Sequence, residues 1–255
     1  QAALQAKLDI PVALSMRYGN PSIESQLLAL HKENSDLAEV LFIPLYPHYA
    51  ESTVTTSIEQ AKAVIKKHKL DIKLTVIPPF YQQDDYINAL VTSASSYLKQ
   101  DFDHLVFSYH GLPESHITKL DPSGQHCLKQ DDCCQQAKEC HNTCYRHQVF
   151  RTTDCFVEKA GLSSDKYSIA FQSRLGRAKW LGPNTEDRLR ELAASGAKNV
   201  LVICPAFVTD CLETLEEISI RGQAVFQEAG GESLTLIPCL NDQEQWVETL
   251  TSWCS

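Results

Sequence analysis

The stretch HLVFSYHGLP, residues 104–113, contains the apolar run LVF at residues 105–107 and closes with a glycine and a proline at positions 111 and 113. A short apolar run that stops at turn residues predicts a strand buried in a parallel sheet. Similar runs, rich in Val, Ile and Leu, lie before and after it, at residues 11–16, 39–45, 72–78, 167–171, 199–204 and 233–238. We therefore expect a protein built around buried strands.

Stretches with helical periodicity separate these runs, at residues 22–31, 57–68, 84–99, 186–194, 211–228 and 242–253. Strands that alternate with helices predict βαβ units, in which helices cover both faces of a parallel sheet. The chain has 255 residues, which exceeds the usual size of one domain, and 43% of them are hydrophobic. The predicted fold class is α/β and doubly wound.

The net charge of −9 restricts the kinds of partner. A nucleic acid or an anionic membrane surface would call for a basic patch, so no nucleic-acid partner is expected. No apolar run approaches the 18 residues of a membrane span, and no signal peptide opens the chain. These features favour an enzyme that handles cations or a neutral organic ligand, while peripheral membrane contact and oligomeric state stay open.

His110 follows the strand of residues 104–108 directly. Ligands of open α/β sheets bind beyond the carboxyl ends of the strands, and histidine can act there as base, acid or metal ligand. Gly111 and Pro113 favour a tight exit that presents this side chain. The alternative is a histidine that only satisfies a turn.

Three carboxylates, Asp210, Glu213 and Glu217, follow the strand of residues 199–204 at spacings of three and four. Such spacings align side chains along one face of a helix. Like charges in a row destabilise a helix unless cations or protons come between them, so the row suits the passage of metal ions or protons. An acidic first turn favoured by the helix dipole is the alternative.

Aromatic and basic side chains stand at other strand exits. Tyr18, Tyr46 and Trp180 could line a cleft for a flat aromatic ligand, although such residues are more often core. Arg17 could pair with ligand carboxylates, with an ordinary surface arginine as the alternative. Ser173 follows the strand of residues 167–171 and adds a hydroxyl to the same edge.

An aperiodic insert, residues 113–144, contains five of the ten cysteines, and all five lie in one stretch of eighteen residues. Ten cysteines in a chain of this length are too few for a secreted disulfide scaffold, so the group indicates a metal site first and disulfides second. The five residues are Cys127, Cys133, Cys134, Cys140 and Cys144.

Five segments together are similar to ferrochelatase of the proteobacterial type. They are MRYGNPS from Met16, FIPLYPHYAEST from Phe42, VFSYHGLPESH from Val106, AFQSRLGRAKWLGPNTEDRL from Ala170, and CPAFVTDCLETLEEI from Cys204. The resemblance implies a lyase that inserts Fe2+ into protoporphyrin IX to form protohaem. It also implies two Rossmann-like, chelatase-type domains with four-stranded parallel sheets, the first incomplete. Alternatives are a chelatase that loads cobalt or nickel into another tetrapyrrole, and a catalytically silent metal or redox sensor.

The resemblance assigns domains as well. It gives an N-terminal half-domain, residues 1–100, and a C-terminal domain, residues 101–255, with a helix at 242–254 that packs back on the first. The family's opening strand, with an Asn-Leu-Gly-Thr-Pro motif, has no counterpart in a chain that begins at Gln1. We therefore expect an N-terminally truncated chain.

Carried over by position, the resemblance gives roles to the residues at the strand exits. His110 and Glu213 become the catalytic pair that also holds the substrate Fe2+, and Asp210 and Glu217 become part of the metal path. Many family members have histidine where this chain has Cys211, so no second histidine is assigned. The substrate-binding residues are Arg17, Tyr18, Tyr46, Ser173 and Trp180.

Some microbial ferrochelatases that this chain resembles carry a 2Fe-2S cluster in such an insert. Four thiolates are needed, and we expect Cys127, Cys133, Cys134 and Cys144, with Cys140 as the substitute. A structural Zn2+ site is the main alternative, because the spacing of Cys140 and Cys144 suits it and His126 or His141 could replace a thiolate. Disulfides or free thiols remain a third interpretation. A cluster of this kind implies the cytoplasm.

Overall fold

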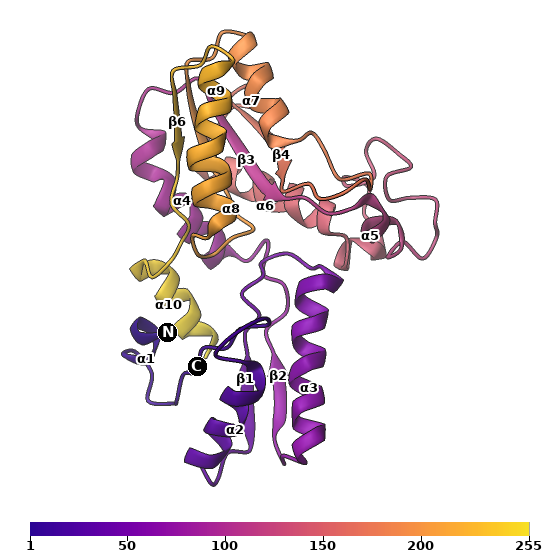
Figure 1. Ribbon diagram of the computed structural model, residues 1–255, viewed down its shortest axis with the longest axis vertical. Helices are drawn as coiled ribbons and strands as arrows, with labels where there is room; N and C mark the ends of the chain where they lie inside the picture. Colours follow the sequence, from indigo (N-terminus) through magenta and orange to yellow (C-terminus); the bar gives the residue numbers. More distant parts are fainter. Residues whose placement is uncertain (255) are drawn as a thin grey trace. The chain divides into compact units, whose positions relative to one another are not determined.

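The computed structural model describes residues 1–254, which form two compact units (Figure 1). Residues 81–241 make up the second unit, whereas residues 1–80 and 242–254 make up the first. The units divide at residue 80 rather than at the expected residue 100. The reason is that α4 (Asp84–Leu98) packs on α6 (Tyr145–Ala160), so residues 81–100 belong with the second unit.

A four-stranded, all-parallel sheet forms the second unit, as predicted. Its central strand is β3 (His104–His110), which lies between β4 (Tyr167–Gln172) and β5 (Asn199–Ile203). The edge strand β6 (Ser233–Leu236) pairs with β5. Parallel order brings the carboxyl ends of all four strands to one edge of the sheet.

Side chains of β3 alternate between the two faces of the sheet. Phe107 contacts Phe156 of α6 edge to face, with ring centroids 5.2 Å apart, and the Tyr109 hydroxyl lies 2.8 Å from the Thr153 hydroxyl. Val106 points to the opposite face, toward α7 (Thr185–Ala194) and α9 (Gln223–Glu228). His110 is an even-numbered residue of the same strand and therefore shares this second face.

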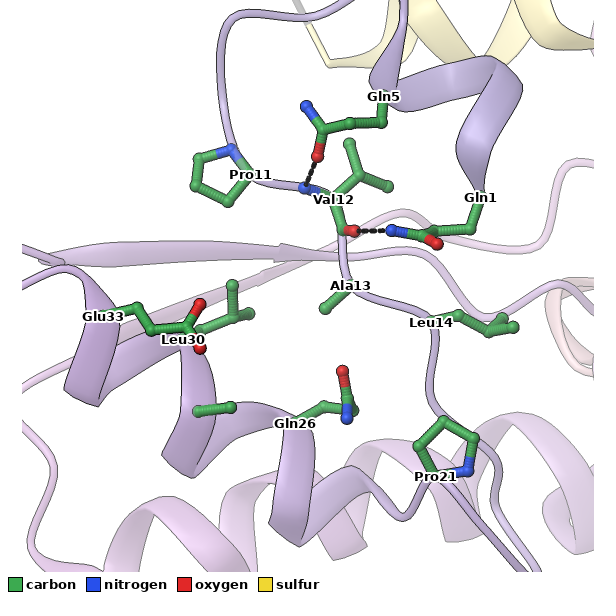
Figure 2. A pocket seen from close by; sticks show the side chains of 11 residues that line it. Gln1, Gln5, Pro11, Val12, Ala13, Leu14, Pro21, Gln26, Leu30 and Glu33 are labelled. Atoms are coloured by element: carbon green, nitrogen blue, oxygen red, sulfur yellow. Dashed lines mark hydrogen bonds between the residues drawn. The ribbon is translucent and has the colours of Figure 1, made fainter.

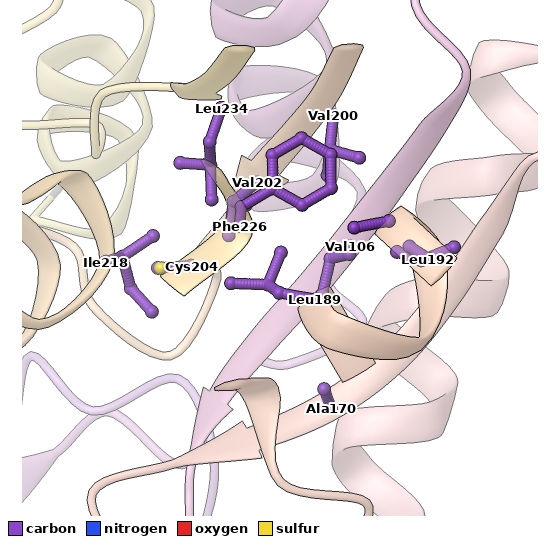
Figure 3. Packing of buried hydrophobic residues seen from close by; sticks show 11 residues of the cluster. Val106, Ala170, Leu189, Leu192, Val200, Val202, Cys204, Ile218, Phe226 and Leu234 are labelled. Carbon is purple, nitrogen blue, oxygen red and sulfur yellow. The ribbon is translucent and has the colours of Figure 1, made fainter. Parts of the chain in front are cut away.

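The second face carries the core of the unit, drawn in Figure 3. Phe226 and Leu189 are fully buried against apolar side chains of all four strands. Removing a ring such as that of Phe226 would cost about 3 to 5 kcal/mol. The labelled members are Val106, Ala170, Leu189, Leu192, Val200, Val202, Cys204, Ile218, Phe226 and Leu234.

The helix α6 was not among the predicted helices. Its apolar residues Tyr145, Val149 and Phe156 follow helical spacing and are buried, and Gly161 ends the helix with a left-handed φ of 66°. That spacing is a signal the sequence analysis overlooked beside the cysteines. With 16 residues α6 is the longest helix, and within residues 1–254 no helix has both the length and the apolar character of a membrane span.

Residues 211–228 do not form the single α-helix that was predicted. A short α8 (Leu212–Thr214) leads into a π-helix, η3 (Leu215–Gly222), and then into α9. The Gln172 side-chain amide donates to the Glu213 carbonyl at 2.6 Å and so occupies an acceptor that an α-helix would offer to its own backbone. The wider π-turn is a recurrent feature of functional sites.

The first unit contains a two-stranded parallel sheet of β1 (Glu39–Phe42) and β2 (Lys73–Val76). The helices α2 (Ile23–Glu33) and α3 (Thr56–His68) pack on each other, and a π-helical turn, η1 (Glu51–Thr55), precedes α3. The terminal helices α1 (Ala2–Gln5) and α10 (Glu244–Trp253) also contact each other. The core comprises Ile23, Leu27, Ala61 and Val64.

The strand predicted at residues 11–16 is wrong, because Met16 makes only an isolated bridge to Ser22. Side chains occupy the backbone groups that a strand would pair, as Figure 2 shows. Val12 donates its N–H to Gln5 Oε1 at 2.7 Å, and its carbonyl accepts from Gln1 Nε2 at 2.5 Å.

Candidate functional site

His110 ends β3 at the carboxyl edge of the second unit's sheet, with its ring half-buried. Its Nδ1 donates to the Gly111 carbonyl at 2.6 Å. In the neutral ring this leaves the Nε2 lone pair free to accept a proton or to bind a metal. The Phe207 ring lies nearby, with centroids 6.2 Å apart.

Gly111 stands where backbone and an aromatic ring approach each other closely. A Cβ atom at this position would lie 2.8 Å from the Gln172 carbonyl oxygen and 3.2 Å from Cε3 of Trp180. The Gly111 N–H donates to that same carbonyl at 2.8 Å. Trp180 is itself fixed, because its Nε1 donates to the Leu175 carbonyl at 3.0 Å. Only glycine fits here without displacing the residues around His110.

Gln172 connects β4 to the start of the acidic helix, and the sequence analysis did not select it as a site residue. It is 1% exposed. Its Nε2 donates to the Glu213 carbonyl, and its Oε1 accepts from the Ser108 hydroxyl at 2.7 Å. A polar residue directly after the apolar run at residues 169–171 was the available signal. Gln172 fixes the backbone of Glu213 relative to the sheet.

Ser173 and Glu217 form a two-point contact. The Ser173 N–H donates to Glu217 Oε1 at 2.7 Å, and its hydroxyl donates to Oε2 at 2.5 Å. Ser173 has a left-handed φ of 66°, which costs energy in a residue with a Cβ atom. Arg221 adds an ion pair to Glu217 at 3.2 Å. This carboxylate therefore stabilises the loop after β4.

Asp210 is likewise held by neighbouring groups. Its Oδ2 accepts from Asn241 Nδ2 at 2.7 Å, and its Oδ1 accepts from the Cys239 N–H and the Thr214 hydroxyl, each at 3.2 Å. Burial disfavours the charged form, but these hydrogen bonds outweigh it and lower the pKa of Asp210. Asp210 is therefore ionised at neutral pH.

Glu213 differs from both of these carboxylates. It is partly buried, and its carboxylate forms no ion pair within the part of the chain that the structure describes. The neighbouring Cys211 thiol hydrogen-bonds to it, and burial together with that contact raises the pKa of Cys211. Asp210 and Glu217 accept hydrogen bonds from loop residues, whereas, apart from the contact with Cys211, no such bond holds the Glu213 carboxylate within the described residues.

The first unit brings three of the predicted site residues together. The Arg17 guanidinium lies 4.5 Å from the centre of the Tyr18 ring, and Tyr18 is 74% exposed. Burial, followed by the nearby Tyr18, raises the pKa of Tyr46. Arg17 Nε is buried and has no hydrogen-bond partner in the described residues. These side chains offer one cation and two phenol rings to a ligand.

A pocket of about 500 Å³ also lies in the first unit, beside α2 (Figure 2). Gln5, Gln26 and Leu30 line it together with the extended segment at residues 11–14. None of the predicted site residues belongs to this lining.

The five clustered cysteines are all buried in the second unit. The Cys127 thiol donates to Cys140 Sγ at 3.6 Å. A hydrogen bond from the Cys134 thiol lowers the pKa of Cys144, which stands at the amino end of α6. The sulfurs of Cys127, Cys134, Cys140 and Cys144 are therefore neighbours, because Cys144 interacts with Cys127 as well as with Cys134.

Polar side chains hold the backbone around these sulfurs. Asp121 Oδ2 accepts from the N–H groups of His126 and Cys127 at 2.8 Å and 2.9 Å. A hydrogen bond from Ser123, followed by the Cys127 N–H, lowers the pKa of Asp121. The insert contains only two short helices, α5 (Glu114–Thr118) and η2 (Glu139–Asn142). Side chains such as Asp121 therefore order most of its backbone.

Cys133 and Cys134 contact Arg146 of α6. Nη1 of Arg146 lies 3.4 Å from Cys133 Sγ and 3.2 Å from Cys134 Sγ. The Cys133 carbonyl accepts from Nε2 of both His126 and His141 at 2.8 Å. A guanidinium beside two sulfurs stabilises negative charge on them.

The cysteine-rich group is able to bind a metal. Two sets of three side chains place their ligand atoms within 4.8 Å of one another, and neither set contains more than two sulfurs. They are His126, Cys140 and His141, and Asp121, Cys127 and Cys140. All ten cysteines are free thiols, so the disulfide interpretation is not supported.

The second unit is a parallel α/β sheet with His110 at its carboxyl edge, an arrangement typical of doubly wound proteins that bind ligands there. Solved structures agree on the fold. SirB from Bacillus subtilis with Fe3+ gives a TM-score of 0.64 at 13% identity, covering 98% of this chain and 85% of that one. The cobalt complex of the sirohydrochlorin chelatase SirB from Bacillus subtilis subspecies spizizenii gives 0.62 at 12% identity, covering 98% and 84%.

Sequence comparison identifies the family. The family model Ferrochelatase matches residues 1–255. Ferrochelatase of Pseudomonas fluorescens strain Pf0-1 is 56% identical over 249 residues, which cover 96% of this chain and 71% of that protein. That of Stutzerimonas stutzeri strain A1501 is 55% identical over 246 residues, covering 96% and 72%. The chain belongs to the ferrochelatase family, whose members are lyases that insert iron into protoporphyrin in haem biosynthesis.

Proposed function

We propose that His110 and Glu213 carry the metal and proton chemistry when this chain inserts Fe2+ into protoporphyrin IX. Insertion of Fe2+ releases two pyrrole protons, so the site needs groups that accept protons and groups that bind a divalent cation. Imidazole nitrogen and carboxylate oxygen can do both. The observation that carries the proposal is the His110 tautomer, since the bond from Nδ1 to Gly111 leaves Nε2 unprotonated in the neutral ring.

Glu213 is the second member because its carboxylate forms no ion pair in residues 1–254, while its backbone is fixed by Gln172. A carboxylate that forms no ion pair, on a fixed backbone, can hold Fe2+ as the last water ligands leave, or it can take the second proton. Asp210 and Glu217 extend the negative charge of this segment. Their carboxylate oxygens already accept hydrogen bonds from neighbouring groups. Their predicted role in a metal path is therefore to attract Fe2+ by negative charge rather than to bind it directly.

Arg17, Tyr18, Tyr46 and Trp180 are proposed to bind the porphyrin. A guanidinium beside a phenol ring, as in Arg17 and Tyr18, suits a propionate next to a flat aromatic macrocycle. Ser173 supports the site indirectly, since its hydroxyl is bound to Glu217.

The role of Glu213 is tested by comparing it with Glu216, a glutamate three positions further along the chain. Glu213→Gln removes one negative charge at nearly constant shape, whereas Glu216→Gln makes the same change at an exposed position. We expect kcat for anaerobic Fe2+ insertion to fall by about a hundredfold or more in Glu213→Gln. Glu216→Gln should retain the wild-type rate. Equal rates in the two variants would remove Glu213 from the mechanism.

We further propose that the cysteines hold a 2Fe-2S cluster. Each iron of such a cluster takes two thiolates, and the four neighbouring sulfurs of Cys127, Cys134, Cys140 and Cys144 can supply them. Their mutual contacts favour this set, so Cys140 replaces Cys133 in the expected set. When bound, the cluster supplies a one-electron redox centre.

A closed zinc site competes less well for the same thiols. Four thiolates around one Zn2+ lie about 3.8 Å from one another in every pair. The sets of ligand atoms found within 4.8 Å contain at most two sulfurs. His126, Cys140 and His141 would give zinc three ligands, so iron, sulfide and zinc must be measured together. One zinc per chain without sulfide would contradict the cluster.

We propose the cytoplasm as the site of action, because thiolates that bind a cluster must stay reduced and a reducing compartment keeps them so.

A further inference from the structure

Tyr145 joins the cysteine insert to His110. It is the first residue of α6, directly after Cys144, and it is 6% exposed. Its hydroxyl donates to the His110 carbonyl oxygen at 2.9 Å. The residues are 35 positions apart in sequence, so only the fold brings them together.

This hydrogen bond fixes one end of a planar peptide group. The peptide that follows His110 contains the His110 carbonyl and the Gly111 N–H, and the Gly111 N–H donates to the Gln172 carbonyl at 2.8 Å. The same peptide is therefore held from α6 at its oxygen and from β4 at its nitrogen. Its orientation sets the position of the next carbonyl, that of Gly111, which binds Nδ1 of the His110 ring.

The insert in turn holds Tyr145. Cys144 is the N-cap residue of α6, and its carbonyl accepts from the Gln148 N–H in the first turn at 3.1 Å. Gln148, in the same turn, donates from Nε2 to the Asn142 carbonyl at 2.9 Å. A change in the order of residues 127–144 therefore moves the turn that carries the Tyr145 hydroxyl.

We propose that Tyr145 is a positioning residue for His110, through which the state of the cysteine insert acts on metal insertion. The proposal rests on the catalytic role given above to His110. Tyr145 touches neither substrate nor metal in this account, so it acts on kcat through the orientation of the imidazole and leaves porphyrin binding unchanged.

Tyr145→Phe tests the positioning, and Tyr86→Phe is the matched control. Tyr86 is also fully buried, and its hydroxyl donates to the Pro205 backbone carbonyl at 2.5 Å. We expect Tyr145→Phe to lower kcat about tenfold with KM for porphyrin unchanged. Deuterium uptake in the peptide of residues 104–112 should rise in this variant alone. Equal kcat and equal uptake in the two variants would overturn the proposal.

A second arm tests the dependence on the insert. Cys140→Ser is introduced into the wild type and into Tyr145→Phe, and both readouts are repeated. If Tyr145 transmits the effect, Cys140→Ser lowers kcat and raises uptake in the wild type, with little further change in Tyr145→Phe. Independent, multiplying effects on kcat would contradict transmission. Iron and sulfide contents report separately on the cluster, and His110→Ala reports on the proposed catalytic role.

Discussion

The N–H and the hydroxyl of Ser173 donate to the two carboxylate oxygens of Glu217, at 2.7 Å and 2.5 Å. This contact connects the loop after β4 to the π-helix η3 and holds Ser173 at a φ of 66°. A backbone conformation that is unfavourable for a residue with a Cβ atom persists only where its surroundings stabilise it. The acidic segment thus determines the shape of the loop that leads to Trp180.

Glu217→Gln should therefore destabilise the protein by about 1 to 3 kcal/mol, because one charge-assisted acceptor of Ser173 and the ion pair with Arg221 are lost. The free energy of unfolding in urea measures this change. Glu216→Gln, one residue away and exposed, should stay within about 0.5 kcal/mol of the wild type. If the two variants are equally stable, the contact does not stabilise the loop.

Gly111→Ala should disturb the site through sterics alone. Its methyl group would lie 2.8 Å from a backbone oxygen, so either Gln172 or His110 must move. We expect kcat to fall at least about tenfold, since small misplacements of reacting groups are costly. Gly182→Ala is the control, because the nearest atoms to its methyl group lie at 3.8 Å and 3.9 Å. A fully active Gly111→Ala variant would argue against close packing around His110.

His48 makes the stability of the first unit depend on pH. Burial lowers the pKa of His48 to about 3 in the folded chain, while the unfolded chain has the ordinary value of 6.5. The unfolded state therefore binds the proton first as the pH falls. Stability is complete above pH 6.5 and declines toward pH 3 by about 1.4 kcal/mol per pH unit from this group. Unfolding of His48→Gln at pH 7 and pH 5 should show a smaller loss than the wild type; an identical loss would exclude His48.

The strands of the second unit and the position of His110 were predictable, because both depend on local patterns. Apolar runs of five or six residues can be recognised as strands from the sequence alone, and a histidine that follows such a run can be recognised in the same way. The strand predicted at residues 11–16 failed for a different reason. Gln1 and Gln5, which lie outside that run, bind its backbone groups, and hydropathy carries no information about such bonds.

The supports of the site were not predictable for a related reason. Gln172 contacts Glu213 across 41 positions, and Tyr145 contacts His110 across 35. Helical spacing marks Tyr145 and a strand end marks Gln172, but neither signal names the distant partner, so these bonds appear only in the fold. The π-helix η3 was missed too, since 3.6-residue periodicity does not distinguish its wider turns from those of an α-helix.

The choice among the five cysteines can be decided by two serine variants. Cys140→Ser should lose the cluster, because Cys140 pairs with Cys127 at 3.6 Å. Cys133→Ser should keep it, since Cys127, Cys134, Cys140 and Cys144 already supply the four thiolates and a fifth thiol is not needed. Iron, sulfide and the electron paramagnetic resonance signal after dithionite reduction are the measurements. Loss in Cys133→Ser with retention in Cys140→Ser would restore the set expected from the sequence.

His110 is proposed to perform the chemistry of iron insertion, and a pair of histidine variants tests this role. His110→Ala is compared with His116→Ala, an exposed histidine of α5, in a single turnover of porphyrin-loaded protein with Fe2+ under anaerobic conditions. We expect His110→Ala to bind the porphyrin with wild-type affinity and to form no haem, while His116→Ala forms haem at the wild-type rate. Haem formation by His110→Ala at the wild-type rate would contradict the account.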